Sequence, residues 1–301
     1  RKIRLGRISM TCRIAYICGV QGLSLVPLLQ DITEPEDLMV LASQSACKEW
    51  EGDAQHIEPI ESAEMLRAAL VTFQPDMILV MTYLSKLDPS LSELSKYGMI
   101  NIHPSLLPEY RGGAPIFYAL KNGEEHVGVT YHFMTEVFDQ GDIIEQASIK
   151  VTPTDCASSV WLKVIKKIFA GLPNVIENRS QWTSMARKQD ENIATTIGFP
   201  SLGERSLSKL KTVSENLSII RACGRATGAR LSLEGHIVFV TEASVAPANA
   251  TLNERPETWI DNESTLLFKV LDGWLEINAA KLDGITISSW RFLMEALAHG
   301  A

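Results

Sequence analysis

Asn101, His103 and Asp139 carry side chains suited to holding a developing negative charge and moving a proton. Asn101 and His103 lie two residues apart at the end of an apolar run, so their side chains point to the same side of an extended segment. Because Pro104 and Pro108 cannot continue a central strand, we expect the pair at its carboxyl end, where open α/β sheets bind ligands. The sequence therefore predicts that the three side chains meet in a solvent-reachable cleft.

Each of these residue types has a distinct part in such a site. An Asn amide can donate a hydrogen bond to an oxyanion, and an imidazole can donate or carry a proton near neutral pH. A carboxylate such as that of Asp139 can fix the tautomer and charge of the imidazole. The alternative is a strand-end turn in which Asn101 caps backbone groups and His103 is half-buried with its hydrogen bonds satisfied.

Residues 101–108 read Asn-Ile-His-Pro-Ser-Leu-Leu-Pro, and this run resembles a motif of the folate-dependent formyltransferases. The family motif is Asn-x-His-x-Ser-Leu-Leu-Pro, and its catalytic Asp precedes an x-Gly pair a few dozen residues later, which matches Asp139. The resemblance implies an N-formyltransferase with Asn101, His103 and Asp139 as catalytic residues. It implies 10-formyltetrahydrofolate as co-substrate and no metal.

The reaction implied by the resemblance is attack of a substrate amine on the formyl carbon. The amide of Asn101 and the donor form of His103 would hold the oxyanion, each contributing roughly 3 to 4 kcal/mol when well placed. Asp139 is expected to orient His103 and to raise its pKa through its opposite charge. Two rival functions stay open, a formyltetrahydrofolate hydrolase and a non-catalytic folate-binding protein.

The same resemblance places the folate between two loops, residues 82–88 and residues 135–138. Most of the contact is expected from backbone groups, and ordinary surface loops are the alternative. The predicted cofactor-binding residues are Leu84, Ser85, Leu87, Leu106, Thr135, Glu136, Val137 and Phe138.

The acceptor amine is predicted to be small. Nucleic-acid binding depends on basic surfaces, whereas this chain has a net charge of -8 and a pI near 5.4. Residues 43–53, where tRNA formyltransferases carry a basic loop, are short and acidic. We expect an amino-sugar nucleotide, an amino acid or a peptide-pathway amine, with methionyl-tRNA as the alternative. Arg111 and Gly113 are the predicted substrate-binding residues, and Arg111 could instead pin its own loop.

The other histidines and the cysteines are not expected to react. His132 lies on a predicted strand beside Phe133, and His126 follows a Glu pair. His56, His236 and His299 have no partners at metal-ligand spacing. Five scattered cysteines are typical of reduced thiols rather than of a disulfide framework.

The elements that must position the site alternate between strand-like and helix-like runs. Strands are predicted at 13–18, 37–42, 77–81, 100–103, 127–134 and 142–151, and helices at 23–30, 63–73 and 157–177. This alternation predicts an α/β fold with a doubly wound, mostly parallel sheet. Farther on, a helix is expected at 207–223 and strands at 230–233, 237–242, 266–270 and 275–279.

The predicted organisation is a catalytic domain at 10–188, a linker at 189–204 and a β-rich domain at 205–301. Relatives in the family carry a barrel-like second domain here, and residues 220–229 resemble a degraded copy of its entry motif. The 301 residues, 46% hydrophobic, include no apolar run long enough to span a membrane, which favours a cytoplasmic protein. Met10 is a plausible start after a basic extension, and the oligomeric state is left open.

Overall fold

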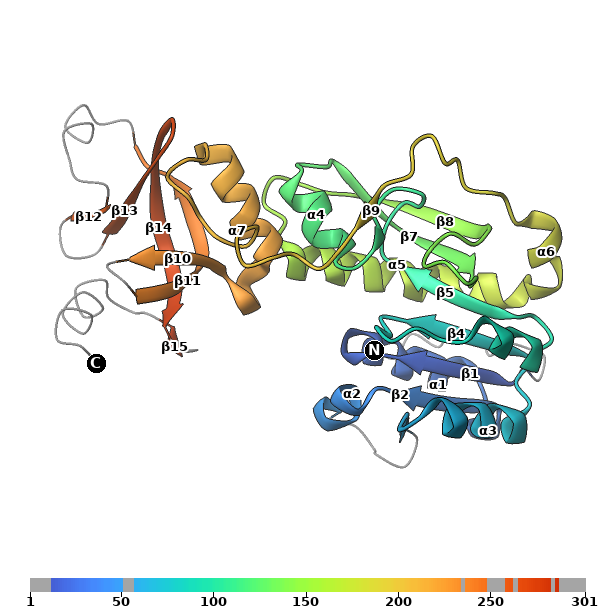
Figure 1. Cartoon of the computed structure of the whole chain (residues 1–301). Helices are drawn as coiled ribbons and strands as arrows, with labels where there is room; N and C mark the ends of the chain where they lie inside the picture. The colour runs from blue at the N-terminus through green and yellow to red at the C-terminus, as the bar shows by residue number, and fades with distance from the viewer. Residues whose placement is uncertain are drawn as a thin grey trace. The chain divides into compact units, whose positions relative to one another are not determined.

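The computed structural model describes residues 12–50, 57–233, 236–247, 258–261, 265–282 and 285–286 (Figure 1). The chain divides into two compact units. The first unit comprises Arg1–Gly112, Val127–Ile149 and Lys163–Thr196, and the second comprises Gly113–His126, Lys150–Leu162 and Ile197–Ala301. Residues 1–11, which include the plausible start Met10, lie outside the described residues.

A seven-stranded sheet in the order β3-β2-β1-β4-β5-β7-β8 forms the centre of the first unit. Its strands are β1 (Ile14–Cys18), β2 (Leu38–Ala42), β3 (Ile57–Pro59), β4 (Met77–Met81), β5 (Met99–His103), β7 (His126–Phe133) and β8 (Ile143–Lys150). The pairs from β3 to β5 are parallel, and β7 runs antiparallel to β5. Figure 1 shows β2, β1, β4 and β5 side by side in this order. The predicted mostly parallel sheet is confirmed.

Apolar side chains cover both faces of this sheet, as expected for parallel strands. Alternate residues Ala15 and Ile17 of β1 pack in a core with Leu66 and Leu70 of α3 (Ala63–Phe73). The intervening residues Ile14, Tyr16 and Cys18 are buried as well. Helix α3 begins at the Ser62 cap, whose hydroxyl accepts a hydrogen bond from the backbone N–H of Met65.

The other helical elements of this part of the chain are shorter, except for α5. They are η1 (Val20–Leu25), α1 (Val26–Ile32), η2 (Pro35–Asp37), α2 (Gln44–Glu49), η4 (Pro89–Leu94), α5 (Ala157–Glu177), η5 (Arg179–Gln181) and α6 (Trp182–Met185). Buried residues recur every four positions in α5, at Val164, Ile168 and Leu172, so one face of this helix is apolar. None of the helices in the described ranges is long and apolar enough to cross a membrane.

The second unit contains an antiparallel sheet in the order β10-β11-β14-β13-β12, with β15 paired to β14. The strands are β10 (Ala229–Leu233), β11 (His236–Val245), β12 (Thr258–Asp261), β13 (Thr265–Val270), β14 (Gly273–Leu282) and β15 (Ile285–Thr286). Helix α7 (Val213–Thr227) contributes Ile219 and Ile220 to the apolar core of this sheet. The predicted β-rich C-terminal region is confirmed as a curled antiparallel sheet.

Several element boundaries differ from those predicted, and local residues explain them. The segment predicted as one helix at 23–30 is η1 followed by α1, because Pro27 suits the first turn of an α-helix. The helix predicted at 207–223 begins after Thr212 instead. The Thr212 hydroxyl accepts from the Glu215 backbone N–H, and the Glu215 carboxylate accepts from the Thr212 backbone N–H.

Some short elements are not distinguished from loops by the sequence patterns. Helix α4 (Pro115–Lys121) belongs to the second unit, and the short strands β6 (Arg111–Gly112) and β9 (Thr196–Ile197) pair with each other. The predicted domain boundaries at 188 and 205 stay predictions. The contacts group residues 113–126 and 150–162 with the C-terminal residues.

Candidate active site

Strands β5 and β7 bring four polar side chains to one place in the sheet. Their antiparallel register sets Asn101 opposite His132 and His103 opposite Thr130. Strand β5 ends at His103, as the downstream prolines predicted. Because side chains alternate along a strand, Asn101 and His103 lie on the same side. That side is where Asp139 is found.

A strained loop between β7 and β8 delivers Asp139 to this position. Asp139 has a φ of 58°, the left-handed region that a non-glycine residue seldom occupies. Gly141 follows at a point of close backbone approach, where a Cβ atom would lie 1.7 Å from the Phe133 carbonyl oxygen. Strained backbone of this kind persists only where neighbouring contacts hold it, and it concentrates at functional sites.

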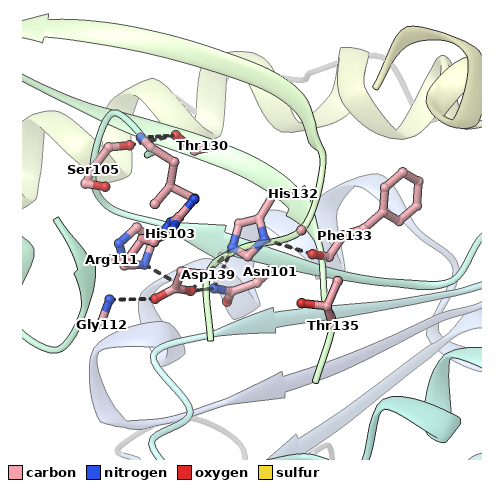
Figure 2. Close-up of polar contacts among 12 residues, drawn as sticks. Asn101, His103, Ser105, Arg111, Gly112, Thr130, His132, Phe133, Thr135 and Asp139 are labelled. Atoms are coloured by element: carbon pink, nitrogen blue, oxygen red, sulfur yellow. Dashed lines mark hydrogen bonds and ion pairs between the residues drawn. The ribbon is translucent and has the colours of Figure 1, made fainter. Parts of the chain in front are cut away.

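Four groups of the first unit surround the Asp139 carboxylate (Figure 2). Its Oδ1 accepts from Asn101 Nδ2 at 3.1 Å, and its Oδ2 accepts from the Gly112 backbone N–H at 2.8 Å. His103 Nδ1 lies 3.6 Å and His132 Nε2 lies 3.4 Å from Oδ1. The three predicted catalytic residues are therefore in contact, and a second imidazole joins them.

The predicted solvent-reachable cleft is wrong for two of these residues. His103 and Asp139 are only 4% and 9% exposed, while Asn101 is half-buried. Tyr110 and Gly112 explain the burial, because their backbone groups bond to the His103 ring and to the Asp139 carboxylate.

The hydrogen-bond partner of His103 Nε2 fixes the position of its proton. Nε2 lies 2.9 Å from the Tyr110 carbonyl oxygen, and a carbonyl oxygen can only accept, so Nε2 carries the hydrogen. The neutral ring then presents the lone pair of Nδ1 beside Asp139. In this state His103 has no free N–H for an oxyanion, and Nδ1 is the atom that can take a proton.

The same reasoning orients His132 and Asn101. His132 Nδ1 donates to the Phe133 carbonyl oxygen at 2.9 Å, which leaves Nε2 as the acceptor of the neutral ring. Asn101 Nδ2 lies 3.1 Å from this Nε2 and 3.1 Å from Asp139 Oδ1. With His132 neutral, both amide hydrogens of Asn101 are thus used within the cluster.

Burial and the neighbouring charges shift the pKa values of the pair in the same direction. Burial alone would raise the pKa of Asp139, but attraction to His103, the adjacent imidazole of His132 and the N–H of Gly112 together hold it well below its usual range. Burial lowers the pKa of His103, and this effect outweighs the opposing attraction to Asp139. Asp139 raises the pKa of His103, as predicted, but desolvation is the larger effect and leaves that pKa below its ordinary value. Asp139 is ionised and His103 is neutral near pH 7.

His132 is the site residue that the sequence reasoning missed. Its place on a predicted strand beside Phe133 favours a structural role. The available signal was its place in a strand that ends a few residues before Asp139, with Thr130 and His132 as polar alternate residues in an otherwise apolar run. Only the register with β5 shows that its ring faces Asn101.

The residues predicted to bind folate lie in three different environments. Leu84, Ser85, Thr135, Glu136, Val137 and Phe138 are exposed, and the Thr135 hydroxyl donates to the Val137 carbonyl oxygen. Leu87 is buried in the core beside Phe73 and Leu91, so only its backbone could meet a ligand. Leu106 is half-buried against Gly128.

The predicted substrate-binding residues have protein partners. The guanidinium of Arg111 is 3% exposed and donates to Gln189 Oε1 and to both carboxylate oxygens of Glu191, at 2.7 to 3.0 Å. These contacts support the loop-pinning alternative, because every side-chain nitrogen of Arg111 already has an acceptor. Gly113 belongs to the second unit, where a Cβ atom would meet the Phe199 ring at 3.0 Å.

Within the described ranges, His, Cys, Asp and Glu residues form no group of three or more that could hold a metal ion. The cluster around Asp139 contains one carboxylate and two imidazoles whose nitrogens are engaged with protein groups.

Known proteins match both the sequence and the fold. The family described as formyl transferase matches residues 37–196, more than half of the chain. A methionyl-tRNA formyltransferase of Latilactobacillus sakei subsp. sakei (strain 23K) is 35% identical over 184 residues, which cover 60% of this chain and 56% of that protein. The chain thus spans a little over half the length of this relative.

Two solved structures share the fold at low sequence identity. HypX from Aquifex aeolicus, in complex with tetrahydrofolic acid, has a TM-score of 0.69 and 17% identity, covering 97% of this chain and 48% of HypX. An N-formyltransferase from Helicobacter canadensis, in complex with folinic acid and dTDP-3-aminofucose, has a TM-score of 0.64 and 17% identity, covering 87% of this chain and 97% of that one.

Proposed function

Because the chain belongs to the formyl transferase family, we propose that it transfers the formyl group of 10-formyltetrahydrofolate to a primary amine of a small molecule. The observation that carries the proposal is the buried carboxylate of Asp139, which is in contact with both Asn101 and His103. These are the residues at which the sequence resembles the family's catalytic motif.

The cluster can accept the proton that an attacking amine must lose. Neutral His103 presents Nδ1 as the acceptor, and its Nε2–H stays bonded to Tyr110. Once Nδ1 takes a proton, the ionised Asp139 at 3.6 Å stabilises the imidazolium by charge attraction. The proton is then available to the folate nitrogen as its bond to the formyl carbon breaks. Asp139 therefore acts by stabilising the charged form of the ring, although burial keeps the resting ring neutral.

His132 can control whether Asn101 is free to act as a donor. When His132 Nε2 takes a proton, it becomes a donor to Asp139 Oδ1, which lies 3.4 Å away. One hydrogen of the Asn101 amide is then released from Nε2 of His132 and is available to an oxygen that gains negative charge. A well-placed donor of this kind is worth about 3 to 4 kcal/mol in the transition state.

The loops on either side of β5 suit a flat heteroaromatic group. Leu84, Val137 and Phe138 are 73%, 53% and 54% exposed, and a pterin ring bound between the two loops would remove these apolar side chains from water. The folate would supply the formyl carbon when bound. In this proposal, backbone groups of residues 84–87 and 135–138 make the polar contacts with the folate.

The acceptor is proposed to be a small amine, with methionyl-tRNA as the second candidate. The Helicobacter structure contains a dTDP-amino sugar, whereas the Latilactobacillus relative is named for methionyl-tRNA. The net charge of -8 favours the small amine, because phosphate contacts need Lys and Arg. Since Arg111 is already paired with Glu191, we do not assign it to the substrate.

A panel of acceptors tests the proposal. The full chain is incubated with 10-formyltetrahydrofolate and, separately, dTDP-amino sugars, amino acids and charged initiator tRNA, and formylated product is measured by mass spectrometry. We expect a small amine to be formylated. Formation of formate in the absence of any amine, with no formylated product from the panel, would identify a hydrolase instead.

A further inference from the structure

Residues 187–195, which include the start of the predicted linker, are bonded to both loops that carry the catalytic cluster. At one end, Arg187 exchanges two backbone hydrogen bonds with Ile143 at 2.8 and 2.9 Å. At the other end, the Thr195 N–H donates to the Pro108 carbonyl oxygen at 3.1 Å, and the Arg111 N–H donates to the Thr195 carbonyl oxygen at 2.9 Å. We call residues 187–195 the strap, and all of it lies in the first unit.

Gln189, in the middle of the strap, uses its whole side-chain amide to join these loops. Nε2 donates to the carbonyl oxygens of Asp139 and Gly141 at 2.7 and 2.8 Å. Oε1 accepts from Nε and Nη2 of Arg111 at 3.0 and 2.8 Å. A flipped amide would place its oxygen against two carbonyl oxygens and its NH2 group against a guanidinium, so the contacts allow only one orientation.

These contacts close a ring that includes the catalytic carboxylate. From the Asp139 backbone, the ring passes through Gln189 to the Arg111 side chain, then to the Gly112 N–H, which donates to Asp139 Oδ2 at 2.8 Å. The residue before Arg111 is Tyr110, whose carbonyl oxygen accepts from His103 Nε2. Gln189 therefore contacts the backbone of Asp139 directly. Through the Arg111 side chain it is also linked to the segment whose Tyr110 carbonyl oxygen binds His103.

The strained backbone at Asp139 needs other contacts to hold it, and this ring of hydrogen bonds supplies some of them. A φ of 58° at Asp139 and of 60° at Tyr110 are conformations that the chain adopts only when other contacts impose them. Gln189 binds the carbonyl oxygen of Asp139 itself, and Arg111 directly follows Tyr110. Gln189 thus binds one strained residue directly and binds the side chain of the residue that follows the other.

We propose that Gln189 is a positioning residue for formyl transfer, which holds the Asp139 carboxylate at its distance from His103 without touching a substrate. The inference rests on the proposed function for its kinetic readout. It extends the site beyond the Asn101, His103 and Asp139 cluster to a residue of the strap.

The sharpest test is Gln189→Glu, because this isosteric change keeps the acceptor for Arg111 and replaces the donor facing Asp139 and Gly141 with an oxygen. Gln181→Glu, at an exposed position of the first unit, adds the same charge and serves as the control. Both variants and the wild type are compared as the full chain. We measure kcat and KM with the preferred amine, thermal unfolding, and the histidine side-chain NMR signals as a function of pH.

We expect Gln189→Glu to lower kcat about tenfold to a hundredfold, as a misplaced catalytic group does, with KM changed little. We also expect the pH midpoint of the His103 signal, assigned by its loss in His103→Gln, to move while Gln181→Glu keeps the wild-type midpoint. A Gln189→Glu protein with lower thermal stability but wild-type kcat and an unmoved His103 midpoint would overturn the proposal. If the wild-type chain formylates no amine, the proposed function fails. The NMR midpoint of His103 still shows whether Gln189 holds Asp139 in place beside His103.

Discussion

At the scale of single residues, the two oxygens of Asp139 accept hydrogen bonds from different donors. Oδ1 accepts from Asn101 and Oδ2 accepts from Gly112. In Asp139→Asn, the new NH2 group must face one of these two donors. The charge that stabilises protonated His103 is lost as well. We expect kcat to fall about 10²- to 10³-fold.

The measurement for Asp139→Asn is single-turnover formylation, with circular dichroism to verify that the variant is folded. Because the side chain is nearly isosteric, the fold should survive better than in Asp139→Ala, which would leave a space inside the cluster. Near wild-type turnover by a folded Asp139→Asn protein would remove this carboxylate from the mechanism.

His132 can be tested by separating its two properties, hydrogen-bond acceptance and proton uptake. His132→Gln keeps an acceptor for Asn101 but cannot take a proton, so we expect a smaller loss of kcat than in His132→Phe. His132→Phe loses both properties, and we expect it to lower kcat about a hundredfold. Equal kcat for wild type and His132→Gln would show that proton uptake by His132 has no part in the reaction.

At the scale of elements, the loop from β7 to β8 depends on a glycine. A Cβ atom at Gly141 would lie 1.7 Å from the Phe133 carbonyl oxygen, so Gly141→Ala must displace the backbone that presents Asp139. We expect a loss of roughly 1–3 kcal/mol in the free energy of unfolding, as for other overpacked sites, and a large loss of activity. Gly198→Ala is the control, because a Cβ atom there meets nothing within 4 Å.

Urea unfolding and turnover of the two glycine variants are compared with the wild type. If Gly141→Ala were as stable and as active as Gly198→Ala, the close approach at residue 141 would have no energetic consequence. The comparison also separates the effect of a lost glycine from the effect of this particular contact.

The elements that could be predicted from the sequence are those whose pattern is complete within a single segment. Helices 63–73 and 157–177 and the strand 77–81 have the predicted bounds, because each has an uninterrupted apolar period. The start of α7 was missed because Leu207 is apolar but packs against the second-unit sheet from an extended segment. Helix α4 was missed because its first residues follow two glycines that are typical of a turn.

In the site, too, only the residues that lie close together in one segment could be paired from the sequence. Asn101 and His103 are close in sequence, so period-two alternation was enough to pair them. His132 and Gln189 reach the site through strand register and through a return of the chain 50 residues after Asp139, which no local pattern records. The order of burial and charge effects at His103 likewise needed the packing around the ring.

At the scale of the whole molecule, the site makes stability depend on pH. The folded-state pKa of Asp139 is lowered, so its contribution is present above its unfolded pKa of about 3.9 and is lost as the pH falls through the folded value. The pKa of His103 is also lowered, so the unfolded chain binds this proton first once the pH falls below about 6.5. Both effects reduce stability toward acid.

We therefore expect the urea midpoint to decrease as the pH falls below about 6.5, and to decrease further below about 4. In His103→Gln the first part of the decrease should be smaller, because that proton can no longer be taken up. A midpoint that rises between pH 7 and pH 5, with His103→Gln behaving like the wild type, would contradict the direction of the shift at His103.

The net charge of -8 bears on the choice between a small amine and a tRNA. If several Lys or Arg side chains bound phosphates, tRNA affinity would fall steeply with salt, by about a thousandfold or more between 50 and 200 mM for six or more contacts. A small amine that meets the site near Asn101 has few such contacts. We expect its formylation rate to change little over this range of salt and tRNA formylation to be negligible throughout. Efficient formylation of charged initiator tRNA that persists at 200 mM salt would reverse the assignment. The tRNA would then have to be bound mainly by contacts other than those between phosphates and Lys or Arg side chains.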